Sequence, residues 1–303
     1  MIGVTRTAVA RAAPGGDEDG FAALRRVLED LDRVVVAFSG GSDSAFLAWV
    51  AHDLLGPSRV LCVTAISPSL APEEREDCRS LASEWGLRWR AIVTDELDDP
   101  AYVANGPDRC ARCKHALMGA LEPVAVAEGA TVVLGVNVDD LGDYRPGQQV
   151  AATRGARFPL AEAGLTKSDV RSWSRRLGLR TWDKPAAACL ASRLPYGTPV
   201  TLGALGSVAR AESALRRLGF TQVRVRHHGP TARVEVPEEQ LADVLARRAD
   251  VVTAVRSSGY AFVALDLDGF RSGSMNRMLV PGASTVPGAT TVSGAIEEGG
   301  GRA

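Results

Sequence analysis

The chain has 303 residues, of which 46% are hydrophobic and 23% charged, so it is long enough for two modest domains with separate cores. Its 35 basic and 36 acidic side chains give a formal net charge of −1, which does not favour a nucleic acid or an anionic membrane as a partner. No apolar run reaches the ~20 residues that cross a bilayer. The first twenty residues contain no apolar segment typical of a signal peptide.

The cysteine content points to a reducing compartment. There are five cysteines, and two of them form the pair Cys110 and Cys113. An odd number with this spacing is more typical of reduced thiols, or of metal or cluster ligands, than of a disulfide framework. We therefore expect a cytoplasmic protein.

The first half of the chain alternates strand and helix patterns. Residues 1–20 are rich in Gly, Ala and Asp and are expected to form a loose extension. Helices are predicted at 21–31, after residue 44 and at 72–85, and strands at 34–38, 60–65, 88–94 and 131–137. This order predicts an α/β fold with a doubly wound parallel sheet, in which ligands bind at the carboxyl ends of the strands.

The first strand runs directly into a glycine loop. The loop comprises Ser39, Gly40, Gly41, Ser42, Asp43 and Ser44. Glycines let successive N–H groups approach an anion, and the following helix adds its unpaired N–H groups and the positive end of its dipole. There is no lysine at the place where a Walker loop requires one. The loop is therefore predicted to hold phosphates; the alternative is a structural turn between a strand and a helix.

A predicted helix and a proline-bracketed connector lead into the second half of the chain. Residues 164–180 predict a helix with Thr166 or Ser168 as its N-cap and Lys167 near its start. Beyond the connector at 183–197, the patterns predict a small α+β domain, with helices at 202–219 and 238–248 and strands at 220–229, 231–237 and 260–269.

We expect four segments in all. They are an extension at 1–20, an ATP pyrophosphatase-like domain at 21–185, an α+β substrate-binding domain at 186–280 and a disordered tail at 281–303.

Several motifs give the chain a family resemblance. The loop SGGxDS after a hydrophobic strand resembles the pyrophosphate loop of the PP-loop ATP pyrophosphatases, an adenine nucleotide alpha hydrolase-like fold. Residues 108–114, 135–147 and 184–201, with the closing stretch 263–279, extend the likeness from about residue 21 to residue 279. In this order they resemble the LarE family of ATP-dependent sulfur transferases, which make thiocarboxylates for the nickel-pincer nucleotide cofactor of lactate racemase.

The resemblance implies an ATP-dependent activation step. A carboxylate oxygen is a poor leaving group, and adenylation turns it into one by making AMP depart. Mg²⁺ would neutralise the pyrophosphate. Asp43 is favoured as its ligand over Asp139 and Asp143, for which solvated turn residues are the alternative. By the resemblance Lys167 meets the ATP phosphates, the alternative being a solvated lysine at a helix end.

The resemblance also implies that Cys189 delivers the sulfur. Lys184 and Arg193 are close to it in sequence, and positive charge lowers the pKa of a thiol. In one form of the family the cysteine gives up its own sulfur and becomes dehydroalanine. In the other, three cysteines, here Cys110, Cys113 and Cys189, hold a [4Fe-4S] cluster. A zinc site with His115, or a pair that binds nothing, are the remaining alternatives.

Substrate binding is expected in the second domain. Arg224 and Arg226 are two apart on a strand, so they project from one face, and two guanidiniums suit a phosphate. By resemblance these two and Arg193 are the phosphate-binding arginines, while Glu212 and Asp243 hold a divalent ion. The alternative for an Arg-x-Arg pattern is an exposed strand face.

The implied reaction adenylates a pyridinium dicarboxylate mononucleotide and then replaces oxygen with sulfur. The expected cofactors are ATP, Mg²⁺ and a [4Fe-4S] cluster, and the family suggests a homohexamer. Two other functions stay open: a PP-loop tRNA thiolase, which the balanced charge disfavours, and a module that binds ATP without catalysis.

Overall fold

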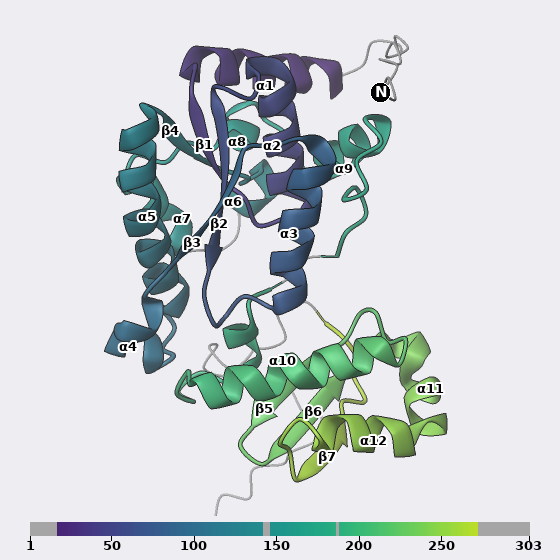
Figure 1. The fold of residues 1–303 in the computed structure, drawn as a ribbon. Coiled ribbons are helices and arrows are strands. Elements are labelled where there is room, and N and C mark those ends of the chain that lie inside the picture. The colour runs from purple at the N-terminus through teal and green to yellow at the C-terminus, as the bar shows by residue number, and fades with distance from the viewer. Residues whose placement is uncertain (1–16, 142–145, 186–187, 272–303) are drawn as a thin grey trace, which may run out of the picture. The chain divides into compact units, whose positions relative to one another are not determined.

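The computed structural model describes residues 17–141, 146–185 and 188–271, and these residues contain two β-sheets (Figure 1). The first sheet has the strand order β3-β2-β1-β4 and all its pairs are parallel. Its strands are β1 (Val34–Ala37), β2 (Val60–Ile66), β3 (Trp89–Val93) and β4 (Thr131–Leu134). The predicted doubly wound parallel sheet is confirmed.

Alternation along β1 supplies a core on each face of this sheet. Val34 and Val36 pack into one cluster with helices α1 (Asp17–Leu31), α2 (Ser42–Leu55), α3 (Pro72–Trp85) and α9 (Lys167–Arg176). Val35 packs into the other cluster, with α5 (Arg109–Glu128) and α7 (Pro146–Thr153). Because successive strand residues point to opposite faces, an unbroken apolar strand is the pattern that a sheet covered on both faces requires.

Short helical segments connect these elements. They are η1 (Glu96–Asp98), α4 (Pro100–Val103), α6 (Val138–Leu141), α8 (Pro159–Glu162) and η2 (Leu190–Arg193). Two of them position residues discussed below, because α6 follows β4 at the carboxyl edge of the sheet and η2 begins directly after Cys189.

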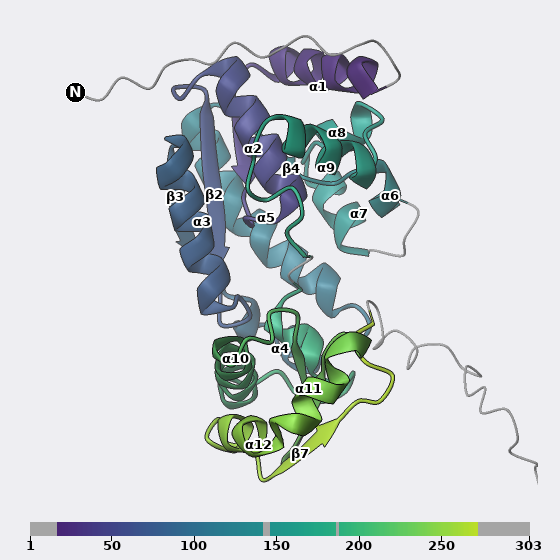
Figure 2. The ribbon, with the colours of Figure 1, turned by 90° about the vertical axis from the view of Figure 1, so that its right-hand side faces the viewer.

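The second sheet is smaller and mixed. Strand β5 (Arg224–His228) pairs antiparallel with β6 (Thr231–Glu235), and β6 pairs parallel with β7 (Phe262–Leu265). Helices α10 (Leu202–Arg217) and α12 (Arg248–Arg256) pack on the face that carries Val225, and they lie side by side in Figures 1 and 2. The remaining segments are η3 (Glu238–Gln240) and α11 (Leu241–Ala246). The predicted second, smaller α+β part of the fold is thus confirmed, and it has a core of its own.

The structure differs from the expectations at several boundaries. Helix α1 begins at Asp17, within the extension predicted to be loose, and the strand predicted at 131–137 ends at Leu134, before α6. Helices α5 and α12 were not predicted. Pro123 inside α5 is unusual in a helix, and Cys110 and Cys113 near the start of α5 were interpreted as metal ligands and not as helical residues. The predicted helix at 238–248 is divided between η3 and α11.

Residues 17–271 belong to one unit by their contacts, so the predicted boundary between residues 185 and 186 stays a prediction. The predicted tail at 281–303 and most of the N-terminal extension lie outside the described residues. No described helix is long and apolar enough to span a membrane.

Candidate functional site

The phosphate loop, residues 39–44, lies at the carboxyl end of β1 and is braced by its own serines. Ser44 Oγ lies 3.0 Å from Ser39 Oγ, accepts a hydrogen bond from the Ser39 N–H at 3.2 Å, and donates to the Gly41 carbonyl at 3.2 Å. Gly40 has φ +70°, and a Cβ there would lie 2.9 Å from Cys78 Sγ, so this position requires glycine.

The loop carries polar groups to which a ligand could bind. Gly41 is the N-cap of α2 and offers no side-chain cap, so the first N–H groups of this helix have no capping side chain. The hydroxyl of Ser42 is buried and has no hydrogen-bond partner among the described residues. An uncapped helix N-terminus beside an unpartnered buried hydroxyl suits an anionic group such as a phosphate.

Asp43 is oriented by a residue from the end of β4. Asn137 is fully buried and its Nδ2 donates to Asp43 Oδ1 at 3.1 Å. Burial raises the pKa of Asp43, the Asn137 hydrogen bond lowers it, and the charge of Asp140 raises it, with a net upward shift. A divalent cation beside this carboxylate would offset the cost of its burial and favour its charged form.

Lys167, Asp139 and Asp143 were also predicted to lie near the bound nucleotide. Lys167 lies close enough to Asp43 for its charge to lower the pKa of that carboxyl. Thr166 caps α9 as predicted, in a capping box with Asp169. Asp139 accepts a hydrogen bond from the Lys167 N–H at 2.8 Å, so it caps the same helix from outside. Asp143 lies outside the described residues.

A glycine at the end of β4 allows the loop to approach. A Cβ on Gly135 would lie 2.7 Å from the backbone nitrogen of Ser44. No side chain fits in that space, so β4 and the start of α2 can be adjacent only if this residue is glycine. Gly135 and Asn137 were not predicted as site residues. They lie at the end of the strand predicted at 131–137, and this place at the carboxyl edge of the sheet was the available signal.

The three candidate cluster cysteines are brought into one region. Cys110 and Cys189 are exposed and Cys113 is half-buried. Burial, and then the charge of Cys189, raise the pKa of Cys113 to about 12. The pKa of the buried Tyr102 phenol is also raised, chiefly by burial and further by the charges of Cys189 and Cys113. A thiol with such a pKa is protonated at neutral pH unless a metal ion replaces the proton.

Two cations that were not predicted lie near these thiols: Lys114, whose charge lowers the pKa of Cys113, and Arg109. Arg109 Nη2 lies 3.8 Å from Cys110 Sγ, and its Nη1 donates to the Ala191 carbonyl at 2.8 Å. Burial acts to lower the pKa of this arginine, but the charges of Cys189 and Cys110 raise it. Lys184, expected beside Cys189, instead binds Gly40, Glu74 and Asp77.

Two of the candidate phosphate-binding arginines are paired within the protein. Arg193 forms a two-point ion pair with Glu212, at 2.8 and 3.1 Å, and Arg226 forms one with Glu235, at 2.9 and 2.7 Å. The four side chains are nearly inaccessible to solvent. Arg224 and Arg226 do lie on one strand, as predicted, but the alternative of an exposed strand face is wrong, since both are buried.

Arg224 differs from its neighbours. It is 8% exposed, has no carboxylate partner among the described residues, and its guanidinium lies 4.4 Å from the centre of the Phe270 ring. Burial, and then the charges of Arg193 and Arg226, lower its pKa to about 10. A buried cation beside two other cations is stabilised by an anion.

The candidate divalent-ion pair is not assembled. Glu212 already accepts hydrogen bonds from Arg193, from Arg216 and from the Val225 N–H. Asp243 is exposed on α11, and no contact joins its side chain to Glu212 in the part of the chain that the structure describes. Within the same residues, no cluster of three or more His, Cys, Asp or Glu side chains has the geometry of a metal site.

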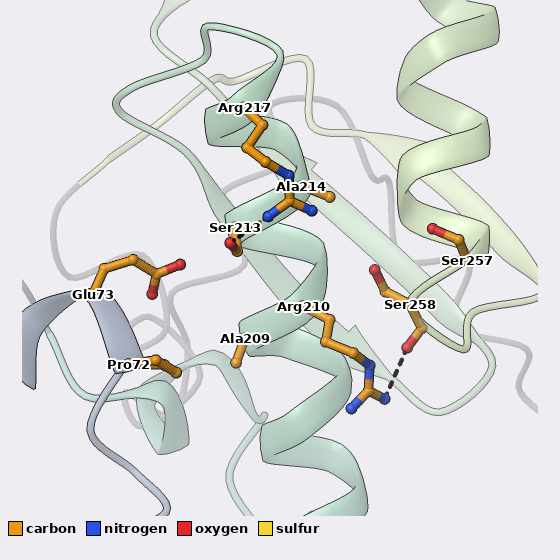
Figure 3. A pocket seen from close by; sticks show the side chains of 9 residues that line it. All are labelled: Pro72, Glu73, Ala209, Arg210, Ser213, Ala214, Arg217, Ser257 and Ser258. Carbon is orange, nitrogen blue, oxygen red and sulfur yellow. Dashed lines mark hydrogen bonds between the residues drawn. The ribbon is translucent and has the colours of Figure 1, made fainter. Parts of the chain in front are cut away.

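A hollow of about 300 Å³ lies elsewhere, against one face of α10 (Figure 3). Arg210 and Arg217 border it, and each binds within the protein, Arg210 to the Ser258 carbonyl at 3.2 Å and Arg217 to Ser213 Oγ at 2.9 Å. None of the predicted site residues lines this hollow.

Comparison with known proteins gives two kinds of match. The family model described as NAD synthase matches residues 23–102, which include the phosphate loop. A glutamine-dependent NAD(+) synthetase of Aquifex aeolicus is 34% identical over 90 residues, which is 28% of this chain and 16% of that protein.

Two relatives match over nearly their whole length. An uncharacterized protein of Synechocystis sp. is 47% identical over 259 residues, 84% of this chain and 96% of that protein. The pyridinium-3,5-bisthiocarboxylic acid mononucleotide synthase of Lactiplantibacillus plantarum is 41% identical over 259 residues, 85% of this chain and 94% of that enzyme.

Proposed function

Because this chain belongs to the LarE family of enzymes, which includes the pyridinium-3,5-bisthiocarboxylic acid mononucleotide synthase of L. plantarum, we propose that it is an AMP-forming sulfur transferase that acts on a pyridinium dicarboxylate mononucleotide. The observation that carries the proposal is that Arg109 lies close to Cys110 and Cys189, and Cys113 close to both of these thiols, in a chain that also has a phosphate loop.

The first step is adenylation of the substrate carboxylate. The loop N–H groups and Ser42 bind the β- and γ-phosphates, and Asp43 would hold the Mg²⁺ that neutralises their charge. A carboxylate oxygen of the substrate attacks the α-phosphorus, and pyrophosphate leaves. Lys167, at the N-terminus of α9, supports the charge of the departing group.

The second step forms the carbon–sulfur bond. In the sacrificial route, the Cys189 thiolate attacks the acyl-adenylate and AMP leaves, which gives a thioester. Elimination across the Cα–Cβ bond then breaks the Cβ–S bond, releases the thiocarboxylate and leaves dehydroalanine at position 189. Arg109 is the cation that stabilises the thiolate before attack.

The alternative route places a [4Fe-4S] cluster on the same three thiols, which in the described residues do not have the geometry of a metal site. Their donor set is three sulfurs from two segments, with Cys110 and Cys189 open to solvent, which suits a cluster that keeps one iron free of protein ligands. Such a cluster, held by Cys110, Cys113 and Cys189, would supply an exchangeable sulfide and leave the polypeptide unchanged.

Arg224 is the residue that we assign to the substrate phosphate. It is the arginine of this group without a carboxylate partner among the described residues, and Arg193 and Arg226 add to the local positive potential. If Glu212 and Asp243 hold a divalent ion, Glu212 must first exchange an arginine for it.

Intact-protein mass spectrometry and visible absorbance on anaerobically purified protein, before and after turnover with ATP and the dicarboxylate substrate, test the proposal. Loss of the mass of hydrogen sulfide at Cys189 supports the sacrificial route, and a brown protein of unchanged mass supports the cluster. No release of pyrophosphate with this substrate would refute the proposed function.

We also propose the homo-oligomer and the cytoplasmic location that the family resemblance and the thiols suggest. Light scattering coupled to size-exclusion chromatography measures the first, and a mass equal to one chain would refute it. Fractionation of the source cells measures the second.

A further inference from the structure

Lys184 joins the phosphate loop to α3. Its ammonium group donates to the Gly40 carbonyl at 3.1 Å, to Glu74 Oε2 at 2.7 Å and to Asp77 Oδ2 at 2.5 Å. Its side chain is 17% exposed. Two of the three N–H donors of this lysine thus bind carboxylates, and the third binds the backbone of the phosphate loop.

The contact with Gly40 fixes the direction of a loop amide. In a trans peptide the carbonyl and the next N–H point in opposite directions, and the described chain contains no cis peptide bond. Because the Gly40 carbonyl points to Lys184, the Gly41 N–H points away from Lys184. For the described residues, no acceptor for this N–H is found within the protein. Lys184 therefore orients a donor that a bound phosphate can use.

The same lysine lies five positions before Cys189. The segment after Cys189 is also attached next to α3, since the Leu190 N–H donates to the Ser69 carbonyl at 2.8 Å. Ser69 lies three residues before the first residue of α3, and Glu74 and Asp77 lie in the first two turns of that helix. Both attachments of the cysteine segment thus involve α3 or the turn before it.

We propose that Lys184 is a positioning residue that couples the occupancy of the phosphate loop to the placement of Cys189. A phosphate that accepts a hydrogen bond from the Gly41 N–H acts on the Gly40–Gly41 peptide, and through the Gly40 carbonyl on Lys184 and on α3. The turn before α3 in turn binds the Leu190 N–H, next to Cys189. The inference rests on the proposed use of ATP and adds a link between the two chemical steps, because the cysteine responds to a filled loop.

The test measures the rate at which iodoacetamide alkylates Cys189, with and without the α,β-methylene analogue of ATP. The full-length chain is stripped of bound metal by a chelator that is then removed, and it is assayed in the reduced state with Mg²⁺. Peptide mass spectrometry separates Cys189 from Cys110 and Cys113. In the unmodified chain, saturating analogue should change the rate at Cys189 by about fivefold or more, the usual size of coupling between sites. In Lys184→Met, at saturating analogue, the change should disappear.

Arg180→Met is the matched control. Arg180 pairs with the same Asp77 carboxylate, at 2.7 Å, and with Glu84, but in the described part of the chain it makes no hydrogen bond to Gly40. This variant weakens the same ion-pair network and should keep the nucleotide response. An equal loss of the response in both variants would show that the network is only structural and would overturn the proposal.

Two further outcomes are decisive. If Lys184→Met does not fold, Lys184→Arg keeps the positive charge beside Glu74 and Asp77 but replaces the compact ammonium with a planar fork, and it should reduce the response; an unreduced response would refute the coupling. Binding of the analogue without any change at Cys189 in the unmodified chain overturns this inference alone. Absence of binding overturns the proposed function and the inference together.

Discussion

The phosphate loop and the arginine group of Arg193, Arg224 and Arg226 both have the composition of an anion site, but they differ in how their polar groups are used. In the loop, Ser42 Oγ and the first N–H groups of α2 have no side-chain partner among the described residues. In the arginine group, two of three guanidiniums already form buried ion pairs with Glu212 and Glu235. The loop is prepared for a ligand, whereas most of the arginine group holds the fold together.

The difference follows from where each region finds its partners. The loop is six consecutive residues, and glycine removes the side chains that would compete for its N–H groups. The arginines are buried, and a buried cation is tolerated only if an anion is supplied. The chain supplies two such anions, and a substrate phosphate would be the third.

The largest expected effect is at Cys189. Cys189→Ser should reduce sulfur transfer by roughly 10³-fold or more, since an alkoxide is not accessible at neutral pH and cannot supply sulfur. Pyrophosphate release with the dicarboxylate substrate should persist, because the phosphate loop is unchanged. Separate assays of pyrophosphate and thiocarboxylate measure the two steps.

Cys110→Ser sharpens this prediction. It removes a cluster ligand but leaves the nucleophile of the sacrificial route in place. Retained single-turnover sulfur transfer in this variant would favour that route, and a loss equal to that of Cys189→Ser would favour the cluster.

A large loss of stability is expected at Glu212. Its side chain is 1% exposed and pairs with Arg193 and Arg216. Glu212→Gln leaves Arg193 as a buried cation without its anion, which costs about 3–5 kcal/mol of unfolding free energy. Urea unfolding followed by circular dichroism measures this loss.

Glu73→Gln serves as the control, because Glu73 is 42% exposed and pairs with Arg216 at 3.8 Å, a geometry in which an ion pair contributes about 0–1 kcal/mol. Equal stability of the two variants would contradict the assignment of Glu212 to the fold.

An intermediate effect is expected at Gly135. In Gly135→Ala the new Cβ would meet the Ser44 nitrogen at 2.7 Å, so the backbone must shift, at a cost of about 1–3 kcal/mol. The displaced loop should also raise the KM for ATP. Gly203→Ala, in the first turn of α10, has no contact closer than 4.0 Å at its Cβ and should be neutral or slightly stabilising. Unfolding free energies and ATP titrations of the two variants test the contrast.

How far the sequence predicts each region also depends on the distance between partners. The phosphate loop, its strand and the Thr166 cap of α9 were predictable, since each depends on residues within a few positions of one another. The pairing of Arg193 with Glu212 and the contact of Lys184 with Gly40 were not, because 19 and 144 residues separate the partners. For the same reason the charge beside Cys189 was assigned to its sequence neighbours Lys184 and Arg193, and the contribution of Arg109 was not predicted.

The smallest effect on stability is expected at Arg224, where the contrast within the arginine group is tested most directly. Arg224→Met removes a buried cation that has no carboxylate partner among the described residues and that Arg193 and Arg226 repel. The unfolding free energy should therefore change by less than about 1 kcal/mol. Arg226→Met removes the two-point ion pair of the buried Glu235 and leaves it only Arg233, so it should cost more, up to about 3–5 kcal/mol. In substrate titrations Arg224→Met should raise the KM for the mononucleotide by about tenfold, the size expected for one lost charge-assisted hydrogen bond. If Arg224→Met were destabilising and left KM unchanged, Arg224 would be part of the fold like its neighbours, and the region would have no cation reserved for the substrate.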